Sequence, residues 1–386
     1  MTETRAVVIV GGGPGGAMTA LLSARAHPGL DLLVLDAAPA PQRKPCGEFL
    51  SPDGVRILNE AGVEAAVMAT GAHPLFGLSL VSPLGAVRSD YHPVCGIAPF
   101  RPYGLGVRRD RFDAVLLAAA AQRAEVRQGV RVVGMERRGA LWRLRLRDQG
   151  GERDLDTPLV IGADGRQSLV RRRAGLDAPP PRQRFALVCR ATGIAHGRHG
   201  EMHLGPLGQV GLAPLGGGEV NLNLLLAEPA RSLLRHRPPA TLMAAALRAT
   251  ESLRARTRSA RLGPLLATGS LPQRSTSVVG DGVALVGDAA GFCDPFTGEG
   301  MCLALQAAEA LAVTLGGLHA RMPDRAALAG YARAYRRRFA LRRSFAEGLQ
   351  RCLGRRAIAE RLVEVIGRQQ ALSRVLIAVT GDYLPV

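Results

Sequence analysis

The feature that most constrains this chain is a glycine-rich turn directly after its first apolar run. The run is Val7-Val8-Ile9-Val10, and the turn reads Gly11-Gly12-Gly13-Pro14-Gly15-Gly16. In such a turn, Gly11 permits a tight bend, Gly13 lets the backbone approach a pyrophosphate, and Gly16 lets the next helix pack closely on the strand. A helix that begins here directs unpaired N–H groups and its positive dipole end at bound phosphates.

A second apolar strand is expected at Asp31-Leu32-Leu33-Val34-Leu35-Asp36. Asp36 ends this strand, where an acidic side chain can accept hydrogen bonds from ribose hydroxyls. Strand, glycine turn, helix, strand and acidic residue in this order predict a Rossmann-type dinucleotide-binding unit. The predicted cofactor ligands in this unit are Gly11, Gly13, Pro14, Gly15, Gly16 and Asp36.

Hydrophobic periodicity predicts the remaining elements. Residues 130–148 are expected to form a hairpin, in which Trp142, Leu144 and Leu146 alternate with arginines, as in a half-buried strand. Asp110 is the expected N-cap of the helix that follows it. From Tyr331 onward the pattern is helical and strongly basic. The other expected elements are a helix over 110–124, a strand over 158–162, antiparallel strands over 184–227 with a turn at 216–218, a strand over 282–287 and a helix over 299–315.

Composition limits the class of protein. The six cysteines are scattered without a C-x-x-C pair, which argues against a disulfide framework and a zinc site, so no metal is expected. No apolar stretch is long enough to span a membrane, and the N-terminus leads straight into a strand rather than a signal peptide, so a cytoplasmic protein is expected. The net charge is +18, carried almost wholly by arginine, with Lys44 the single lysine. Such a chain attracts nucleotides, diphosphates, acidic carrier proteins or lipid headgroups, whereas no nucleic-acid recognition motif is present.

A second glycine-rich segment lies at residues 285–300. It reads Leu285-Val286-Gly287-Asp288-Ala289-Ala290-Gly291 and ends at Gly298-Glu299-Gly300. The segment resembles the Gly-Asp motif of flavoproteins of the aromatic-hydroxylase and geranylgeranyl-reductase type. The resemblance implies that Asp288 binds the ribityl chain or ribose of FAD, and that Pro295, Gly298 and Gly300 shape the loop beside the flavin ring. The following helix would then direct its positive dipole end at the anionic reduced ring.

Two shorter segments resemble motifs of the same superfamily. Gly162-Ala163-Asp164-Gly165 is similar to its Asp-Gly motif, which is associated there with FAD and with NAD(P)H use. The resemblance implies that Asp164 and Gly165 lie at the cofactor. Arg109-Asp110-Arg111-Phe112-Asp113 is similar to a segment whose first arginine contacts FAD, which assigns that role to Arg109.

The segment Arg43-Lys44-Pro45-Cys46-Gly47-Glu48 resembles the K-P-C-G segment of geranylgeranyl reductases, many of which carry glycine in place of Glu48. The resemblance places Cys46 and Gly47 beside the flavin. Cys46 is a candidate proton donor or tuner of the flavin environment, or a small residue packed on the cofactor. Glu48 is a candidate hydrogen-bond partner of FAD or an acid/base group.

The resemblance implies an α/β fold in which a Rossmann-type FAD-binding domain carries an inserted antiparallel-sheet substrate domain and a helical C-terminus. The expected division is 1–75, 104–176 and 276–330 for the FAD-binding domain, 76–103 and 177–275 for the substrate domain, and 331–386 for the helical region. The substrate region departs from the reductases, because their aromatic Y-x-W-x-F-P signature is reduced to Gly211-Leu212-Ala213-Pro214.

These motifs lead to the hypothesis of an FAD-dependent oxidoreductase, with flavin reduced by NAD(P)H or a protein donor and a hydrophobic isoprenoid, polyketide or quinone-like substrate. A monooxygenase acting on an aromatic or polyketide substrate is the alternative, although Gly291 stands where typical aromatic hydroxylases carry histidine. Halogenation is disfavoured, because Lys44 and Trp142 are the only lysine and tryptophan. An alternative of another class is a non-enzymatic basic protein that binds membranes or nucleic acid. The sequence does not identify the substrate, the electron donor or the oligomeric state.

The basic C-terminal region suggests a docking partner. Arginines there are interleaved with apolar residues at helical spacing, so one helix face can pack while the other stays basic. An acidic carrier protein or an anionic membrane surface is the hypothesised partner, the latter placing the protein peripherally at the inner membrane surface. The arginines considered are Arg336, Arg337, Arg338, Arg342, Arg343, Arg355 and Arg356.

Overall fold

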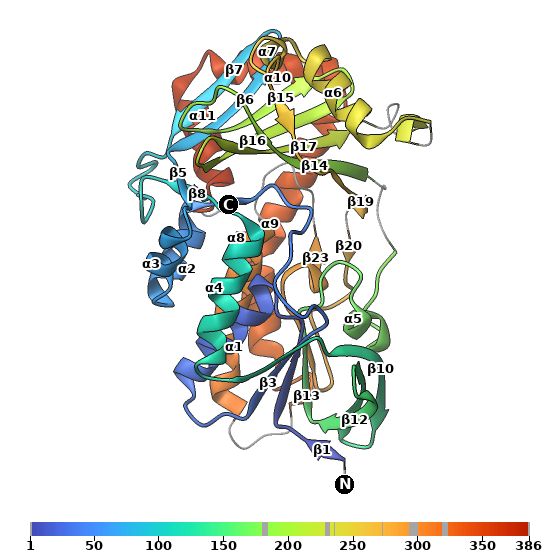
Figure 1. Cartoon of the computed structure of the whole chain (residues 1–386). Helices are drawn as coiled ribbons and strands as arrows, with labels where there is room; N and C mark the ends of the chain where they lie inside the picture. Colours follow the sequence, from blue (N-terminus) through green and yellow to red (C-terminus); the bar gives the residue numbers. More distant parts are fainter. Residues whose placement is uncertain are drawn as a thin grey trace.

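The computed structural model describes residues 2–179, 184–227, 232–234, 236–271, 273–292, 300–318 and 323–384. Two sheets of unlike topology occupy opposite ends of the molecule, as Figure 1 shows. A mainly parallel sheet lies at the end that holds the N-terminus, and a larger, mainly antiparallel sheet lies at the other end. The α/β fold and the helical C-terminal region expected from the sequence are therefore confirmed.

The parallel sheet is built around the N-terminal strand. β2 pairs in parallel with β3 on one side and with β13 on the other. These strands are buried on both faces, which explains their unbroken apolar sequences. In sheet order its strands are β21 (Val279–Gly280), β22 (Val283–Leu285), β13 (Leu159–Gly162), β2 (Val7–Val10), β3 (Leu32–Asp36) and β9 (Glu125–Gln128).

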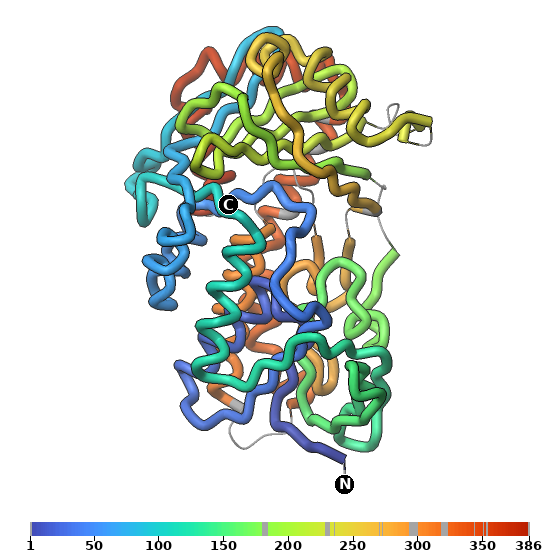
Figure 2. Tube along the Cα trace, in the orientation of Figure 1, coloured from blue at the N-terminus to red at the C-terminus, as the bar shows by residue number. Residues whose placement is uncertain are grey.

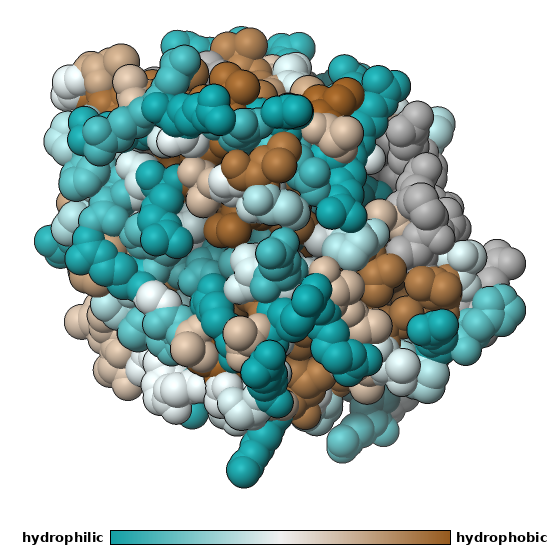
Figure 3. Space-filling model, turned by 90° about the horizontal axis from the view of Figure 1, so that it is seen from above, coloured by the Kyte–Doolittle hydropathy of each residue, from teal (hydrophilic) through white to brown (hydrophobic). Residues whose placement is uncertain are grey.

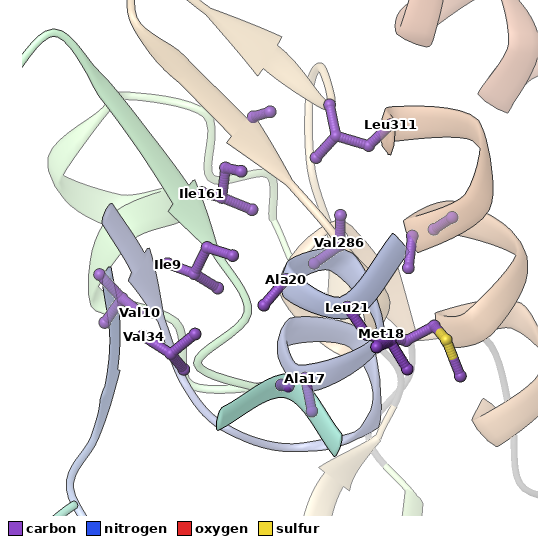
Figure 4. Close-up of a cluster of buried hydrophobic side chains, with 14 of the residues drawn as sticks. Ile9, Val10, Ala17, Met18, Ala20, Leu21, Val34, Ile161, Val286 and Leu311 are labelled. Atoms are coloured by element: carbon purple, nitrogen blue, oxygen red, sulfur yellow. The ribbon is translucent and has the colours of Figure 1, made fainter. Parts of the chain in front are cut away.

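Three helices cover one region of this sheet: α1 (Pro14–Ala26), α4 (Arg109–Ala121) and α8 (Gly300–Leu315). α1 packs against both α4 and α8. Figure 4 shows the resulting core, in which Ile9 and Val34 of the sheet lie close to Ala17 and Ala20 of α1. This core holds the glycine turn between β2 and α1 in place.

The start of α4 differs from expectation. The helix begins at Arg109 with Arg108 at the N-cap position, so Asp110 lies in its first turn rather than at its cap. Asp110 instead pairs with Arg108 and with Arg190 of a distant strand. The Asp110 carboxylate therefore forms an ion pair with a distant residue instead of capping the helix.

A four-stranded sheet contains the hairpin predicted from alternation. Trp142, Leu144 and Leu146 are buried, while Arg145 and Arg147 of the same strand are exposed. Its strands in order are β1 (Glu3–Thr4), β12 (Gly151–Thr157), β11 (Leu141–Asp148) and β10 (Arg131–Arg138).

The large sheet has different cover on its two faces. α6 (Pro239–Ala249) and α7 (Glu251–Arg254) pack with one face. α10 (Arg356–Gly367) and α11 (Gln370–Thr380) pack with the other. β15 and β6 pair in parallel, although antiparallel strands were expected throughout. Its strands in order are β18 (Arg261–Leu262), β14 (Arg184–Thr192), β17 (Glu219–Leu226), β16 (Gly208–Gly216), β15 (Gly200–Gly205), β6 (Gly77–Ser82) and β7 (Gly85–Asp90), with β19 (Leu266–Leu271) also pairing with β14.

The long helix α9 (Ala329–Leu353) connects the two ends of the molecule. It contacts β21 and α8 in the parallel-sheet half and α10 beside the large sheet. Figure 2 traces this path in orange and red.

The remaining elements are short. A small sheet is formed by β4 (Phe49–Leu50), β8 (Gly104–Gly106) and β5 (His73–Leu75), and β20 (Gln273–Arg274) pairs with β23 (Gly291–Phe292). The other helices are α2 (Pro52–Glu60), α3 (Glu64–Ala69), α5 (Leu169–Arg173) and the 3-10 helices η2 (Gly287–Ala289) and η4 (Gly316–Leu318).

Candidate active site

The glycine turn between β2 and α1 has the close approaches that its sequence predicts. Gly11 has φ +109°, and a Cβ on it would lie 2.3 Å from the Ala163 carbonyl oxygen. A Cβ on Gly16 would lie 1.9 Å from the Gly11 carbonyl oxygen. Gly13 is different, because the nearest atom to its added Cβ is Lys44 Nζ at 3.9 Å. Gly11 and Gly16 are therefore fixed by packing, whereas Gly13 borders open space that a phosphate group can occupy.

Asp36 supports this turn from the end of β3. Its carboxylate accepts hydrogen bonds from the backbone N–H of Gly12 and of Ala38, each at 2.8 Å. The predicted ribose ligand is thus held rigidly beside the glycine turn. Each carboxylate oxygen has further lone pairs with which to accept a ribose hydroxyl.

Asp164 lies directly after β13, next to the glycine turn. Its Oδ2 accepts from the backbone N–H of Leu169 and Val170 at the start of α5. Its Oδ1 is buried and has no hydrogen-bond partner among the described residues. A buried acceptor left unpaired is costly, so this atom fits the role of a ligand for a bound polar group.

Asp288 lies in η2, directly after β22. Burial raises the pKa of its carboxyl, and the nearby cations Arg166, Arg109 and Lys44 oppose that rise. The turn at Gly11, Asp164 and Asp288 all follow neighbouring parallel strands, β2, β13 and β22. The carboxyl ends of parallel strands are where open α/β sheets bind nucleotides, so the residues present fit an FAD.

A cluster of charges faces the same region from α4 and the K-P-C-G segment. The Arg109 guanidinium forms two hydrogen bonds of 2.8 Å with Asp113, whose carboxylate lies 3.7 Å from Lys44 Nζ. Burial raises the pKa of the Cys46 thiol, although nearby Arg109 lowers it in part. Cys46 therefore holds its proton near neutral pH.

Glu48 is almost fully buried and has φ +54°. Its Oε1 accepts from the backbone N–H of Arg109, and its Oε2 accepts from the side-chain amide of Asn221 at 3.0 Å. Both oxygens also accept from the Arg190 guanidinium. A carboxylate with these partners is suited to joining the K-P-C-G segment to the large sheet.

An apolar pocket adjoins this segment. It contains about 740 Å³ of space between protein atoms, part of which is open solvent. Register pairs Leu78 with Gly200, Leu80 with Met202, and Gly211 with Asn223, so these residues lie on the sheet face that lines the pocket. The other lining residues are Gly47, Phe49, Ser79, Glu201, Leu212, Ala213, Leu349, Leu376, Ile377 and Thr380.

The predicted site residues thus fall into two groups. The glycine turn, Asp36, Asp164 and Gly165, and Asp288 lie at the carboxyl ends of the parallel strands, and Gly300 begins α8. Cys46, Gly47, Glu48 and Arg109 lie between that edge and the large sheet. Pro295 and Gly298 lie outside the described residues.

Sequence reasoning missed four contributing residues. Arg190 and Asn221 reach the K-P-C-G segment from β14 and β17, where Asn221 donates to the Cys46 carbonyl oxygen at 3.0 Å. Leu376 and Ile377 of α11 form part of the pocket wall. Arg190 and Asn221 could have been found because they are polar residues within the apolar strands of 184–227. No sequence signal indicated that α11 forms part of the pocket.

Comparison with known proteins identifies the family. The model of the FAD binding domain family matches residues 4–341. The chain belongs to this family. It is an FAD-dependent oxidoreductase, and interpretation as a non-enzymatic basic protein is wrong.

Relatives of this flavoprotein include reductases of lipids and quinones. It is 31% identical over 345 residues to the menaquinone reductase of Mycolicibacterium smegmatis, covering 82% of this chain and 78% of the relative. It is 27% identical over 324 residues to the digeranylgeranylglycerophospholipid reductase of Methanosarcina mazei, covering 80% and 74%. A geranylgeranyl bacteriochlorophyll reductase-like structure from Thermoplasma acidophilum superposes with a TM-score of 0.82 at 22% identity, covering 97% of this chain and 96% of that one, which shows a shared fold.

Proposed function

We propose that this flavoprotein is a reductase that uses NAD(P)H or a protein donor to reduce a hydrophobic substrate of isoprenoid, polyketide or quinone type. The observation that carries the proposal is the apolar pocket that begins at Gly47 and Phe49, directly beside the predicted flavin loop. Aliphatic side chains predominate in its wall, and Asn223 is one of few polar groups there. A pocket of this composition favours an extended apolar molecule.

The residues that hold FAD in this proposal are those at the carboxyl ends of the parallel strands. The backbone of α1 and Lys44 receive the pyrophosphate beside Gly13, while Asp36 and Asp164 accept hydrogen bonds from sugar hydroxyls. Asp288 binds the ribityl chain. Bound flavin, once reduced by NAD(P)H or a protein donor, would supply a hydride, and reduction of a carbon–carbon double bond requires one proton as well. NAD(P)H, a proton and the alkene thus give NAD(P)+ and the saturated product.

Cys46 is the group we propose as proton donor. Its thiol is kept protonated by burial, and it lies in the segment that adjoins the pocket. Asn221 fixes the backbone at Cys46 through its carbonyl oxygen. Glu48 is better suited to positioning this segment than to exchanging protons, because its carboxylate is engaged by Arg190, Asn221 and the Arg109 backbone.

The test is to photoreduce the bound flavin without oxygen and then add detergent-dispersed alkenes or quinones. Anaerobic reoxidation of the flavin that depends on such a substrate and yields its reduced form is expected. Reoxidation that occurs only with oxygen, together with a hydroxylated product, would instead establish the monooxygenase alternative. Anaerobic titration with NADH and NADPH separates these donors from a protein donor.

A further inference from the structure

The outer faces of α10 and α11 carry apolar side chains that point into solvent. Ile358 and Val365 of α10 are 43% and 54% exposed, and Leu372 and Val375 of α11 are 44% and 38% exposed. Ile358 and Val365 are seven residues apart and so share one face of α10. The opposite face of α10 is already used, because Ala359 and Val363 are buried against β6 and β7. The exposed residues are therefore a second apolar face.

Arginines surround this second face. The segment 355–375 contains five arginines and two glutamates, so its net charge is +3. Arg361 and Arg368 both pair with Glu364, yet 75% and 77% of their side chains are exposed. Figure 3, seen from the end that holds the large sheet, shows apolar and hydrophilic side chains intermixed on that end of the molecule. The arginines of the segment are Arg355, Arg356, Arg361, Arg368 and Arg374.

Two of the α9 arginines that were expected in the docking region are engaged within the molecule. Arg338 is engaged by Glu309 and Asp53, and Arg342 is buried and pairs with Asp382. These two arginines hold α9 to the rest of the molecule, so they do not belong to a free basic face. The side chain of Arg343 lies outside the described residues.

α11 connects the outer face to the substrate pocket. Leu372 and Val375, in the N-terminal half of α11, are exposed, whereas Leu376, Ile377 and Thr380, in its C-terminal half, line the pocket. The exposed half of α11 therefore continues directly into the half that lines the pocket. A strongly apolar substrate has a very small free concentration in water and resides in a lipid phase.

We propose that the outer face of α10 and α11 docks on an anionic membrane surface, from which the pocket behind α11 receives its substrate. Delivery of the substrate from the membrane rests on the proposed function, whereas the docking itself does not. A helix with aliphatic and arginine side chains on one surface lies in the plane of a bilayer interface, with its apolar groups inserted and its arginines among the lipid phosphates. Within the described ranges, every helix is too short or too polar to traverse a bilayer, so the contact is peripheral.

The test is flotation of the FAD-loaded protein with vesicles of phosphatidylcholine, with or without phosphatidylglycerol. The wild type is expected to float with the anionic vesicles and to detach at high salt. The double variant Arg361→Gln/Arg368→Gln should partition roughly 30-fold more weakly, because each arginine near an anionic surface contributes about fivefold. Arg145→Gln/Arg147→Gln is the matched control, since it removes two exposed, carboxylate-paired arginines from β11.

A second pair of variants tests the apolar contribution. Ile358→Ser/Val365→Ser should also weaken partitioning, whereas Ile97→Ser/Val313→Ser, which removes exposed aliphatics elsewhere, should not. Equal flotation of the α10 variants and their controls would overturn the proposal. Wild-type binding to vesicles that does not depend on phosphatidylglycerol would also overturn it. The same holds if light scattering shows a dimer that the Val365→Glu substitution dissociates. Flotation involves no turnover, and the proposed function is tested separately with detergent-dispersed substrate, so either can fail alone.

Discussion

Glu48 and Arg190 form a buried ion pair that joins the K-P-C-G segment to strand β14, 142 residues away. The Arg190 guanidinium donates to both carboxylate oxygens of Glu48 and also pairs with Asp110 at the start of α4. Three segments that are distant in the sequence therefore meet at one guanidinium. The pair connects the predicted flavin loop to the sheet that lines the substrate pocket.

Removing one partner of this pair should be costly. Glu48→Gln leaves a buried guanidinium partly uncompensated and is expected to lower the free energy of unfolding by about 3 kcal/mol. Arg190→Met should cost a similar amount. The double variant should lose clearly less than the sum of the two, which urea unfolding would measure. Additive losses would show that the two side chains contribute independently.

Gly13→Val should abolish FAD retention without unfolding the chain. The added side chain projects into open space and collides only with a bound pyrophosphate. The flavin-to-protein absorbance ratio of the purified variant, together with its circular dichroism, checks this. Gly197→Val is a suitable control, because a Cβ there also meets nothing within 4 Å. Full flavin occupancy of Gly13→Val would refute the assignment of the glycine turn.

Asp288→Ala should weaken FAD binding by about 1.5–3 kcal/mol, the range of a hydrogen bond to a charged group. The stability of the FAD-free protein should fall little. Burial of the charged carboxylate is unfavourable, as its raised pKa indicates, so its removal costs the folded chain little. Titration of the apoprotein with FAD, followed by flavin fluorescence, gives the dissociation constants. Unchanged affinity would contradict the role given to Asp288.

Leu376→Trp should fill the pocket from the α11 side. We expect kcat/KM for an apolar substrate to fall at least tenfold, because the bulky ring occupies the space for the substrate. Leu372→Trp, one turn earlier in the exposed N-terminal part of the same helix and outside the pocket wall, is the control and should retain activity on detergent-dispersed substrate. FAD content should be normal in both variants. Equal activity of the two would place the substrate elsewhere.

Glu201 predicts a contribution to acid stability. Burial alone would raise the pKa of this carboxyl, but hydrogen bonds from His203 and Arg256 outweigh it and lower the pKa from 4.5 to about 2. A lowered pKa stabilises the folded chain above the unfolded value, and this stabilisation is lost as the pH falls from about 4.5 toward 2. Up to about 3 kcal/mol is involved. Glu201→Gln should therefore flatten the dependence of the unfolding free energy on pH in that window, and an unchanged slope would contradict the assignment.

Local sequence signals predicted the parts of the fold that depend on neighbouring residues. The run Val7–Val10, the glycine turn and Asp36 form a contiguous unit whose strand, turn and helix follow from apolar content and backbone freedom. The alternation around Trp142 gave the hairpin for the same reason. The division into domains and the roles of individual site residues stay predictions.

Features that depend on distant partners were not predictable in this way. Asp110 was expected to cap a helix, yet Arg190 engages it from β14. The parallel pairing of β15 with β6 joins segments more than a hundred residues apart, and local periodicity carries no information about strand direction. The pocket likewise requires that α11 fold back onto the sheet.

The walls of that pocket come from residues 47, 49, 78–80, 200–202, 211–213, 223, 349, 376, 377 and 380. During synthesis the glycine turn and its neighbouring strands can assemble early, but the pocket is closed only when α11 has been made and has packed. A nascent chain can therefore acquire its cofactor cradle before its substrate pocket has all of its walls. Loss of α11 would be expected to leave a flavin-binding protein with an open, solvent-filled groove.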